Sequence, residues 1–303
     1  MKTAYNKKNV LVTGATGYLG KYIVESLLNK GWDVGLLLKR DKYFSNAEQF
    51  KGKADFFEYT GTTESVVNAV LEFHPELVIH LASLFLAWHE TKDITNLIES
   101  NVLFGTQLLE AMAVNKVTKF LNTGTFWQHY NNEDYNPVCL YAATKESFEK
   151  IARFYVECYS MDFLTLKLFD IYGPDDPRRK LFTLLREHIG SKDPLMMSPC
   201  DQKIDLVFLG DVVEAFLTAS ELLFSEDMKG MTEFAVSSGK TEILRRVVEI
   251  YFNTIGKPMN VVFGGRPYRN REIMEPWKTG KILPGWSAKT GLIEGIKLME
   301  KIE

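Results

Sequence analysis

Tyr141 and Lys145 form a Tyr-x-x-x-Lys pattern at the start of a predicted helix over 141–159. Residues four positions apart share one face of a helix. A phenol ordinarily has a pKa of about 10, and a nearby ammonium lowers that pKa because it favours the phenolate. We therefore expect Tyr141 to exchange a proton with a sugar or alcohol oxygen, although the same spacing also occurs at ordinary surface helix starts.

Two hydroxyl side chains, Thr123 and Thr125, stand upstream of this pair, at the end of a predicted strand over 119–123. The carboxyl ends of parallel strands are where open α/β sheets bind their ligands. A threonine hydroxyl there is placed to bond a reacting carbonyl oxygen beside the tyrosine. The pattern predicts one catalytic threonine and leaves both positions open.

A Gly-x-x-Gly-x-x-Gly turn, Gly14 to Gly20, joins the first predicted strand (9–13) to an amphipathic helix. Glycines at these places permit a tight turn, a close approach of a pyrophosphate and close packing of helix on strand. The N–H groups of the helix start then face the phosphates, although such a turn also occurs without a ligand. The turn residues expected to bind a dinucleotide are Gly14, Thr16, Gly17, Tyr18, Leu19 and Gly20.

The end of the second predicted strand (34–38) bears on the choice of dinucleotide. A carboxylate there would bond the ribose 2′-hydroxyl of NAD, but the position holds Leu38, followed by Lys39 and Arg40. A guanidinium holds a 2′-phosphate by charge-assisted bonds, so we predict NADP(H), with Arg40 favoured over Lys39. A solvated surface pair is the alternative, and Asp41, one residue late, keeps NAD open.

Apolar strands alternate with helices as far as residue 169, which predicts an α/β fold with a doubly wound parallel Rossmann sheet. Residues 1–170, with returns near 204–236, are expected to form the dinucleotide-binding domain. Residues 171–203 and 237–303 are expected to form a smaller, discontinuous substrate lobe.

The composition excludes several classes of protein. The 303 residues carry 36 Lys and Arg against 39 Asp and Glu, so no excess of positive charge is available for a nucleic acid. The start of the chain lacks an apolar export signal, and no apolar run reaches the roughly 18 residues of a membrane span. The three cysteines read as free thiols and the five histidines show no metal-binding spacing. We expect a cytoplasmic protein without a metal.

Six stretches carry a family resemblance: TGATGYLG at 13–20, HLAS at 80–83, NVLFGTQLLEA at 101–111, YAATK at 141–145, LFDIYGP at 168–174 and DLVFLGDVVEA at 205–215. Together they resemble the extended short-chain dehydrogenase/reductases of the NAD-dependent epimerase/dehydratase family, over nearly the whole chain. The resemblance implies a triad of Thr123, Tyr141 and Lys145, with Thr125 as a substitute because Phe-Trp-Gln stands where the family has Val-Tyr-Gly. It also implies that Leu81, Ala82, Ser83 and the Asn101 helix support the cofactor.

The family resemblance further implies a nucleotide-sugar substrate. The segments around 265–277 and 283–286 are similar to 4-ketoreductases of the CDP-abequose synthase and dTDP-fucose-forming kinds, which act in deoxysugar biosynthesis for surface polysaccharide such as the lipopolysaccharide O-antigen. Gly124 and Thr125 stand where dehydratases carry an acid and a base, which disfavours dehydration. A dissociable NADPH suits a net reduction, so we expect reduction of the C4 keto group of a dTDP- or CDP-linked 4-keto-6-deoxyhexose.

The residues expected to bind this substrate are Phe85, Trp88, Thr125, Trp127, Arg266 and Arg271. Arg266 would hold the pyrophosphate and Arg271 would add a second contact. The alternative for these arginines is that they belong to a basic surface loop. The alternative for Trp127 is packing in the core. The competing functions are an NAD-dependent 4-epimerase, a dinucleotide-binding protein without turnover and a reductase of a carbonyl compound that carries no nucleotide. The resemblance also implies a homodimer formed through the helices at 96–115 and 141–159.

Overall fold

The structure, a computed structural model, describes residues 7–39, 46–225 and 228–302. Its main sheet is parallel and has seven strands in the order β10-β6-β5-β4-β1-β2-β3. The chain order reverses between β1 and β4, which gives the topological switch point of a Rossmann fold. The predicted α/β class is confirmed. The strands are β1 (Asn9–Thr13), β2 (Asp33–Lys39), β3 (Asp55–Tyr59), β4 (Leu77–His80), β5 (Lys119–Thr125), β6 (Asp162–Leu168) and β10 (Met231–Val236).

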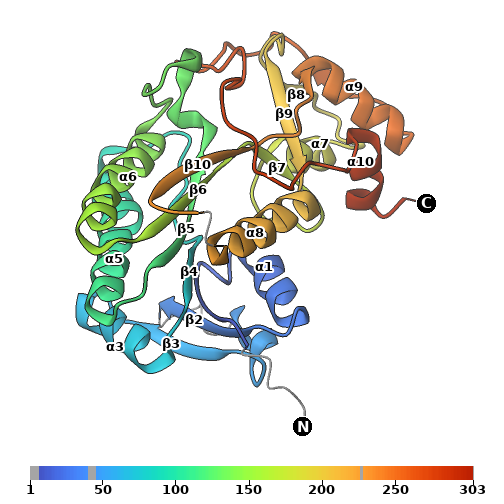
Figure 1. Ribbon diagram of the computed structural model, residues 1–303. Helices are drawn as coiled ribbons and strands as arrows, with labels where there is room; N and C mark the ends of the chain where they lie inside the picture. The colour runs from blue at the N-terminus through green and yellow to red at the C-terminus, as the bar shows by residue number, and fades with distance from the viewer. Residues whose placement is uncertain (1–6, 40–45, 226–227, 303) are drawn as a thin grey trace. The chain divides into compact units, whose positions relative to one another are not determined.

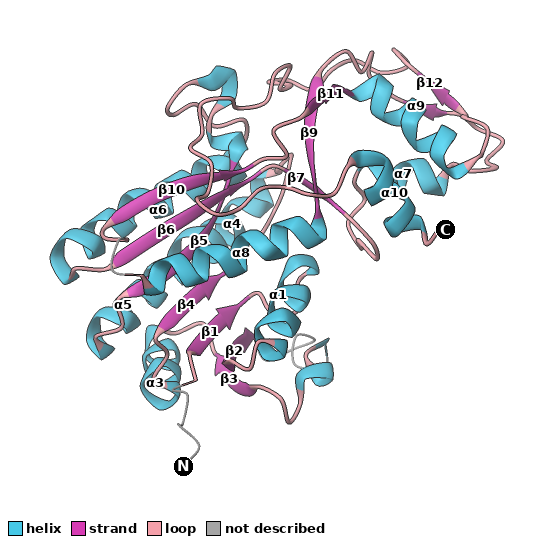
Figure 2. Ribbon diagram, turned by 45° about the vertical axis from the view of Figure 1, so that its right-hand side comes forward, coloured by secondary structure: helices cyan, strands magenta, loops and turns pink. Residues whose placement is uncertain are grey.

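Helices cover both faces of this sheet (Figures 1 and 2). On one face lie α3 (Thr63–Phe73), the helix built from α4 (Ile94–Ile98) and α5 (Phe104–Asn115), and α6 (Leu140–Tyr159); α1 (Tyr18–Asn29) lies on the other. Apolar strand residues such as Leu11, Val78 and Phe120 pack beneath Leu108 and Phe148 of the helices. Burial of this apolar surface is the main force that holds the layers together.

A π-helical turn, Glu99–Leu103, joins α4 to α5 and makes them one continuous helix. Such turns add a residue to the helical ladder and frequently occur at functional sites. The turn carries Asn101, which is 1% exposed. It therefore directs a polar side chain inward from a helix that otherwise buries apolar groups.

The chain divides into two compact units. The first comprises residues 1–125, 139–167 and 216–234, and the second comprises 126–138, 168–215 and 235–303. The second unit thus includes residues 126–138, which the sequence analysis grouped with the dinucleotide-binding domain. Helix α8 (Leu209–Phe224) contributes residues to both.

The second unit has its own sheets and core. Strands β11 (Thr241–Ile243), β9 (Lys203–Phe208) and β7 (Asp170–Tyr172) form one sheet, and β12 (Val261–Val262) pairs with β8 (Leu195–Met196). Its helices are α7 (Leu181–Glu187), α9 (Leu244–Ile255) and α10 (Leu292–Glu300). Their apolar faces meet in a core that includes Tyr172, Leu185, Val248, Tyr251 and Ile296.

None of the helices in the described ranges is both long and apolar enough to span a bilayer.

Candidate active site

The glycine turn between β1 and α1 leaves no room for a side chain at Gly14 or Gly20. Gly14 has a φ of 71°, and a Cβ there would lie 2.5 Å from the Ala82 backbone nitrogen. A Cβ on Gly20 would lie 2.1 Å from the Gly14 carbonyl oxygen. Only glycine fits at these two positions, and the fit brings α1 directly against the end of β1.

The start of α1 offers an anion-binding site. Gly17 precedes the helix in extended backbone, with no side-chain cap and no acidic residue in the first turn. The N–H groups of a first helical turn lack partners within the helix, and the helix dipole there favours negative charge. Gly17 is exposed and Thr16 and Leu19 are half-buried, whereas Tyr18 is buried. The turn therefore fits the pyrophosphate of a dinucleotide.

The end of β2 presents no carboxylate up to Lys39. Leu38 is buried and pairs with Glu58 of β3, and Lys39 is exposed. Arg40, the other predicted contact for a 2′-phosphate, lies outside the described residues. Within the described part of this strand, Lys39 is the charged group closest in sequence to the predicted 2′-phosphate position.

Thr123 lies at the end of β5 and is tied to the neighbouring strand. Its Oγ1 donates to the His80 carbonyl oxygen at 2.9 Å. The His80 ring is buried, with Nδ1 2.8 Å from Thr13 Oγ1, which also accepts from the Ala82 N–H at 3.3 Å. Burial lowers the pKa of His80 well below its ordinary value, and the Lys145 ammonium adds to this effect. His80 is therefore a neutral link between the strand of the glycine turn and the strand of Thr123.

Tyr141 and Lys145 occupy the first two turns of α6 and are 8% and 2% exposed. The Phe85 ring meets the Tyr141 ring edge-on, with 5.0 Å between centroids. Burial lowers the pKa of Lys145, Glu149 raises it and Lys167 lowers it, and together they bring it to about 8. The charge on Lys145 is therefore sensitive to its charged neighbours near neutral pH.

Asn101 holds the segment after β4 and the start of α6 in place. Its Oδ1 accepts from the Leu84 N–H at 2.7 Å, and its Nδ2 donates to the Leu84 carbonyl at 3.0 Å and to Thr144 Oγ1 at 3.0 Å. Thr144 Oγ1 in turn donates to the Tyr141 carbonyl oxygen at 2.7 Å. The structure therefore gives Asn101 protein contacts that position Tyr141, so any support it gives a cofactor acts through them.

The other predicted site residues of the first unit differ in their burial. Leu81, Ala82 and Ser83 follow β4 directly and are half-buried at the carboxyl edge of the sheet. Thr125 is buried at the end of β5, whereas Trp88 is 76% exposed. The structure thus brings the cofactor residues to the edge where the triad stands, and leaves Trp88 on the surface.

The predicted substrate residues Trp127, Arg266 and Arg271 belong to the second unit. The Arg269 guanidinium lies 5.8 Å from the centre of the Trp127 ring, and Arg266 is exposed. The Arg271 guanidinium donates to Asn136 Oδ1 and lies 4.4 Å from the centre of the Tyr130 ring. Its buried Nε has no hydrogen-bond partner among the described residues.

The sequence pattern of the NAD dependent epimerase/dehydratase family matches residues 10–229. The chain belongs to this family.

Family members with assigned names match almost the full chain. CDP-abequose synthase of Salmonella typhimurium is 27% identical, over 97% of this chain and 98% of that protein. UDP-glucose 4-epimerase of Mycolicibacterium smegmatis is also 27% identical, over 94% and 95%. The crystal structure of Thermus thermophilus UDP-glucose 4-epimerase with NAD has a TM-score of 0.80 at 26% identity, over 97% and 98% of the two chains.

Several residues that surround the predicted triad were not themselves predicted. They include His80, Thr13, Thr144, Glu149 and Lys167. His80 and Thr13 lie within stretches that carry the resemblance, but nothing in their spacing predicts that they contact each other. Across the described residues, no three His, Cys, Asp or Glu side chains are grouped as metal ligands.

Proposed function

We propose that this chain reduces the C4 keto group of a CDP- or dTDP-linked 4-keto-6-deoxyhexose with NADPH, in deoxysugar biosynthesis for surface polysaccharide. The observation that carries the choice of a reductase is the end of β2, where buried Leu38 replaces the ribose-binding carboxylate and Lys39 is exposed. Similarity to CDP-abequose synthases over most of the chain supports the nucleotide-sugar substrate.

Each residue of the proposed triad has a distinct role. Bound NADPH would supply the hydride. Tyr141 then donates its phenolic proton to the substrate oxygen as negative charge develops there. Lys145 favours the resulting phenolate and binds the nicotinamide ribose. Thr123 donates a hydrogen bond to the same substrate oxygen, which requires its hydroxyl to rotate away from the His80 carbonyl.

The test follows NADPH absorbance with CDP-, dTDP-, GDP- and UDP-linked 4-keto-6-deoxyhexoses. We expect stoichiometric loss of NADPH with the CDP or dTDP compound. Tyr141→Phe should reduce kcat by about 10²–10⁴-fold with little change in NADPH affinity. Tyr155→Phe is the matched control, because Tyr155 lies on α6 but donates to Glu110 at 2.9 Å. Undiminished turnover in Tyr141→Phe contradicts the assigned role.

An NAD-dependent 4-epimerase is the second candidate. It is supported by the similarity to UDP-glucose 4-epimerases, one of which was crystallised with NAD. An epimerase recycles its hydride and needs no added reductant. NAD released on denaturation, together with conversion of a UDP-sugar in the absence of NADPH, would favour this reading over the reductase.

The proposal extends to assembly as a homodimer in the cytoplasm. Helices α5 and α6 lie side by side on one face of the first unit (Figure 1) and expose apolar side chains. Val114, Phe154 and Tyr159 are 59%, 56% and 45% exposed. Large apolar groups gathered on neighbouring helices favour burial against another protein surface, and the proposed partner is a second copy of this chain.

A further inference from the structure

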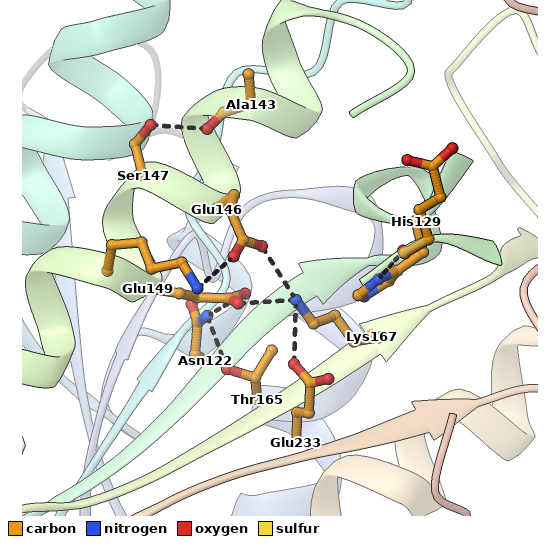
Figure 3. A network of polar contacts seen from close by, with 11 residues as sticks. Asn122, His129, Ala143, Glu146, Ser147, Glu149, Thr165, Lys167 and Glu233 are labelled. Atoms are coloured by element: carbon orange, nitrogen blue, oxygen red, sulfur yellow. Dashed lines mark hydrogen bonds and ion pairs between the residues drawn. The ribbon is translucent and has the colours of Figure 1, made fainter. Parts of the chain in front are cut away.

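A buried ion pair between Lys167 and Glu149 lies one helical turn along α6 from Lys145. Lys167 of β6 is fully buried, and its Nζ lies 2.7 Å from Glu149 Oε2 of α6 (Figure 3). Two further carboxylates surround the same ammonium, from Glu233 of β10 at 3.3 Å and from Glu146 of α6 at 3.9 Å. Glu146 is also paired with the exposed Lys150 at 3.0 Å.

This cluster touches both elements that carry the proposed triad. Glu149 stands one helical turn after Lys145, on the same face of α6. Asn122 precedes Thr123 in β5, and its Nδ2 donates to Thr165 Oγ1 at 3.1 Å and to Glu149 Oε1 at 3.4 Å. The pair therefore connects the helix of Tyr141 and Lys145 to the strand of Thr123.

Stability alone is a weak reason to bury this pair. The cost of removing two charges from water approaches or exceeds their attraction, and apolar side chains of similar volume often serve as well. Burial raises the pKa of Glu149, and the adjacent Lys167 ammonium opposes that rise. The main effect of the Glu149 and Lys167 charges is therefore on the ionisation of neighbouring side chains.

The charges of Glu149 and Lys167 act on the ammonium group of Lys145. The titratable groups facing it are Tyr141 and Glu149 from its own helix, His80 from β4 and Lys167 from β6. Glu149 favours the Lys145 ammonium and Lys167 opposes it. Because the pKa of Lys145 is about 8 with burial and both neighbours acting together, loss of either neighbour should change the charged fraction in the range where enzymes work.

We infer that Glu149 and Lys167 are positioning residues that fix the location and the charge of the Lys145 ammonium, and through it the acid strength of Tyr141. This inference rests on the proposed role of the Tyr141–Lys145 pair. It holds for either candidate reaction, because reduction and epimerisation both require proton transfer at the sugar oxygen.

The test compares the pH dependence of kcat/KM in two variants. Glu149→Gln removes an anion beside Lys145, so the alkaline limb should move to lower pH by about one unit. Lys167→Met removes a cation, so the limb should move to higher pH by about as much. The double variant buries neither charge, and its limb should return close to that of the unaltered protein. A merely structural role would not produce opposite shifts.

A readout independent of turnover separates this inference from the proposed function. Protein labelled with ε-¹³C-lysine gives the Lys145 titration directly, and the signal is assigned by its loss in Lys145→Arg. The Lys145 midpoint should move in the same two directions as the limbs. If no NADPH is consumed with any sugar but these midpoints move as expected, the proposed function fails and the inference stands.

Asp162→Asn is the matched control for Glu149→Gln. Asp162 is a buried carboxylate at the opposite end of β6, paired with Lys229 at 3.4 Å, and five residues of strand place it about 17 Å from Lys167. It should destabilise the protein without moving the Lys145 titration. If a charge-removing variant fails to fold, Glu149→Asp, which keeps the charge but withdraws it, should give a smaller shift to lower pH. Unmoved midpoints, or shifts in the same direction for Glu149→Gln and Lys167→Met, overturn the inference.

Discussion

In the proposed mechanism the Thr123 hydroxyl has two possible acceptors, the His80 carbonyl oxygen and the substrate oxygen. Only the first is present before substrate binds. In the structure the hydroxyl donates to the His80 carbonyl oxygen at 2.9 Å. A substrate oxygen that gains negative charge is the stronger acceptor, because hydrogen bonds to charged groups are about twice as strong as neutral ones. We therefore expect the bond to His80 to hold the Thr123 oxygen in place, and the hydroxyl to rotate toward the substrate oxygen as charge develops there.

We expect Thr123→Val to lower kcat by about 10²–10³-fold, the loss typical of one such donor, while Thr123→Ser keeps most of the activity. Steady-state kinetics with NADPH measure both. Thr125→Val is the comparison, because Thr125 is the alternative hydroxyl at the end of β5. A larger loss in Thr125→Val than in Thr123→Val would transfer the role to Thr125.

His80 should make the protein less stable in mild acid. Its pKa is lowered in the folded state, so below its unfolded pKa of about 6.5 the unfolded chain takes up a proton that the folded protein does not. The stabilisation present above that pH is lost as the pH falls toward the folded pKa, with a slope of up to about 1.4 kcal/mol per pH unit.

Urea unfolding at pH 7 and at pH 5 tests this expectation against His80→Gln, which retains a polar group beside Thr13. The variant should lose less unfolding free energy between the two pH values than the unaltered protein. His74→Gln replaces a histidine at the end of α3 and should leave the difference unchanged. Equal losses in all three proteins would show that His80 does not titrate on unfolding.

Among the structural elements, the junction between β1 and α1 has no room for an added methyl group at Gly20. Gly20→Ala would place a methyl group 2.1 Å from the Gly14 carbonyl oxygen, so α1 must move away from the strand. We expect at least about a tenfold loss of NADP(H) affinity and a cost in stability of about 1–3 kcal/mol. Fluorescence titration with NADPH measures the affinity.

Gly31→Ala is the control for that variant. Gly31 follows α1 with a φ of 79°, and an added Cβ meets nothing within 4 Å. Its cost is backbone strain of about 1–2 kcal/mol, with cofactor affinity unchanged. Weakened binding in Gly31→Ala to the same degree would show that loss of stability alone explains the Gly20 result.

Most of the elements around the site could be predicted because each has strong local periodicity. The strand at Asn9–Thr13, the helix at Leu140–Tyr159 and their neighbours begin and end within a few residues of the expected positions. Strand β3 (Asp55–Tyr59) was missed, because it is short and mostly half-buried and so lacks a clear apolar run. The π-helical turn Glu99–Leu103 has no local sequence signal, since the same residues also suit an α-helix.

The contacts that complete the site could not be predicted in the same way. Glu146 and Glu149 are spaced like solvated residues of a surface helix, yet both are buried against Lys167. Their burial depends on the register of α6 against β6, which only the folded sheet defines. The catalytic roles of the triad stay predictions, drawn from short stretches whose residue types and order carry the family resemblance.

For the whole molecule, assembly is the property most open to direct measurement. We expect light scattering after size exclusion to give twice the chain mass, and Phe154→Asp to give the mass of one chain, because a buried carboxylate opposes burial of the α6 surface. Leu71→Asp, at a side chain on α3 that is 53% exposed, should leave the dimer intact. A single-chain mass for the unaltered protein would refute the dimer.

The distribution of lysines also has a practical consequence. Lys145 and Lys167 are 2% and 0% exposed, whereas the side chains of Lys92, Lys150 and Lys229 are 73–76% exposed. Amine-reactive reagents modify the amines they reach, so covalent coupling to an activated resin should proceed through the surface lysines. The immobilised protein should therefore keep both interior ammonium groups unmodified.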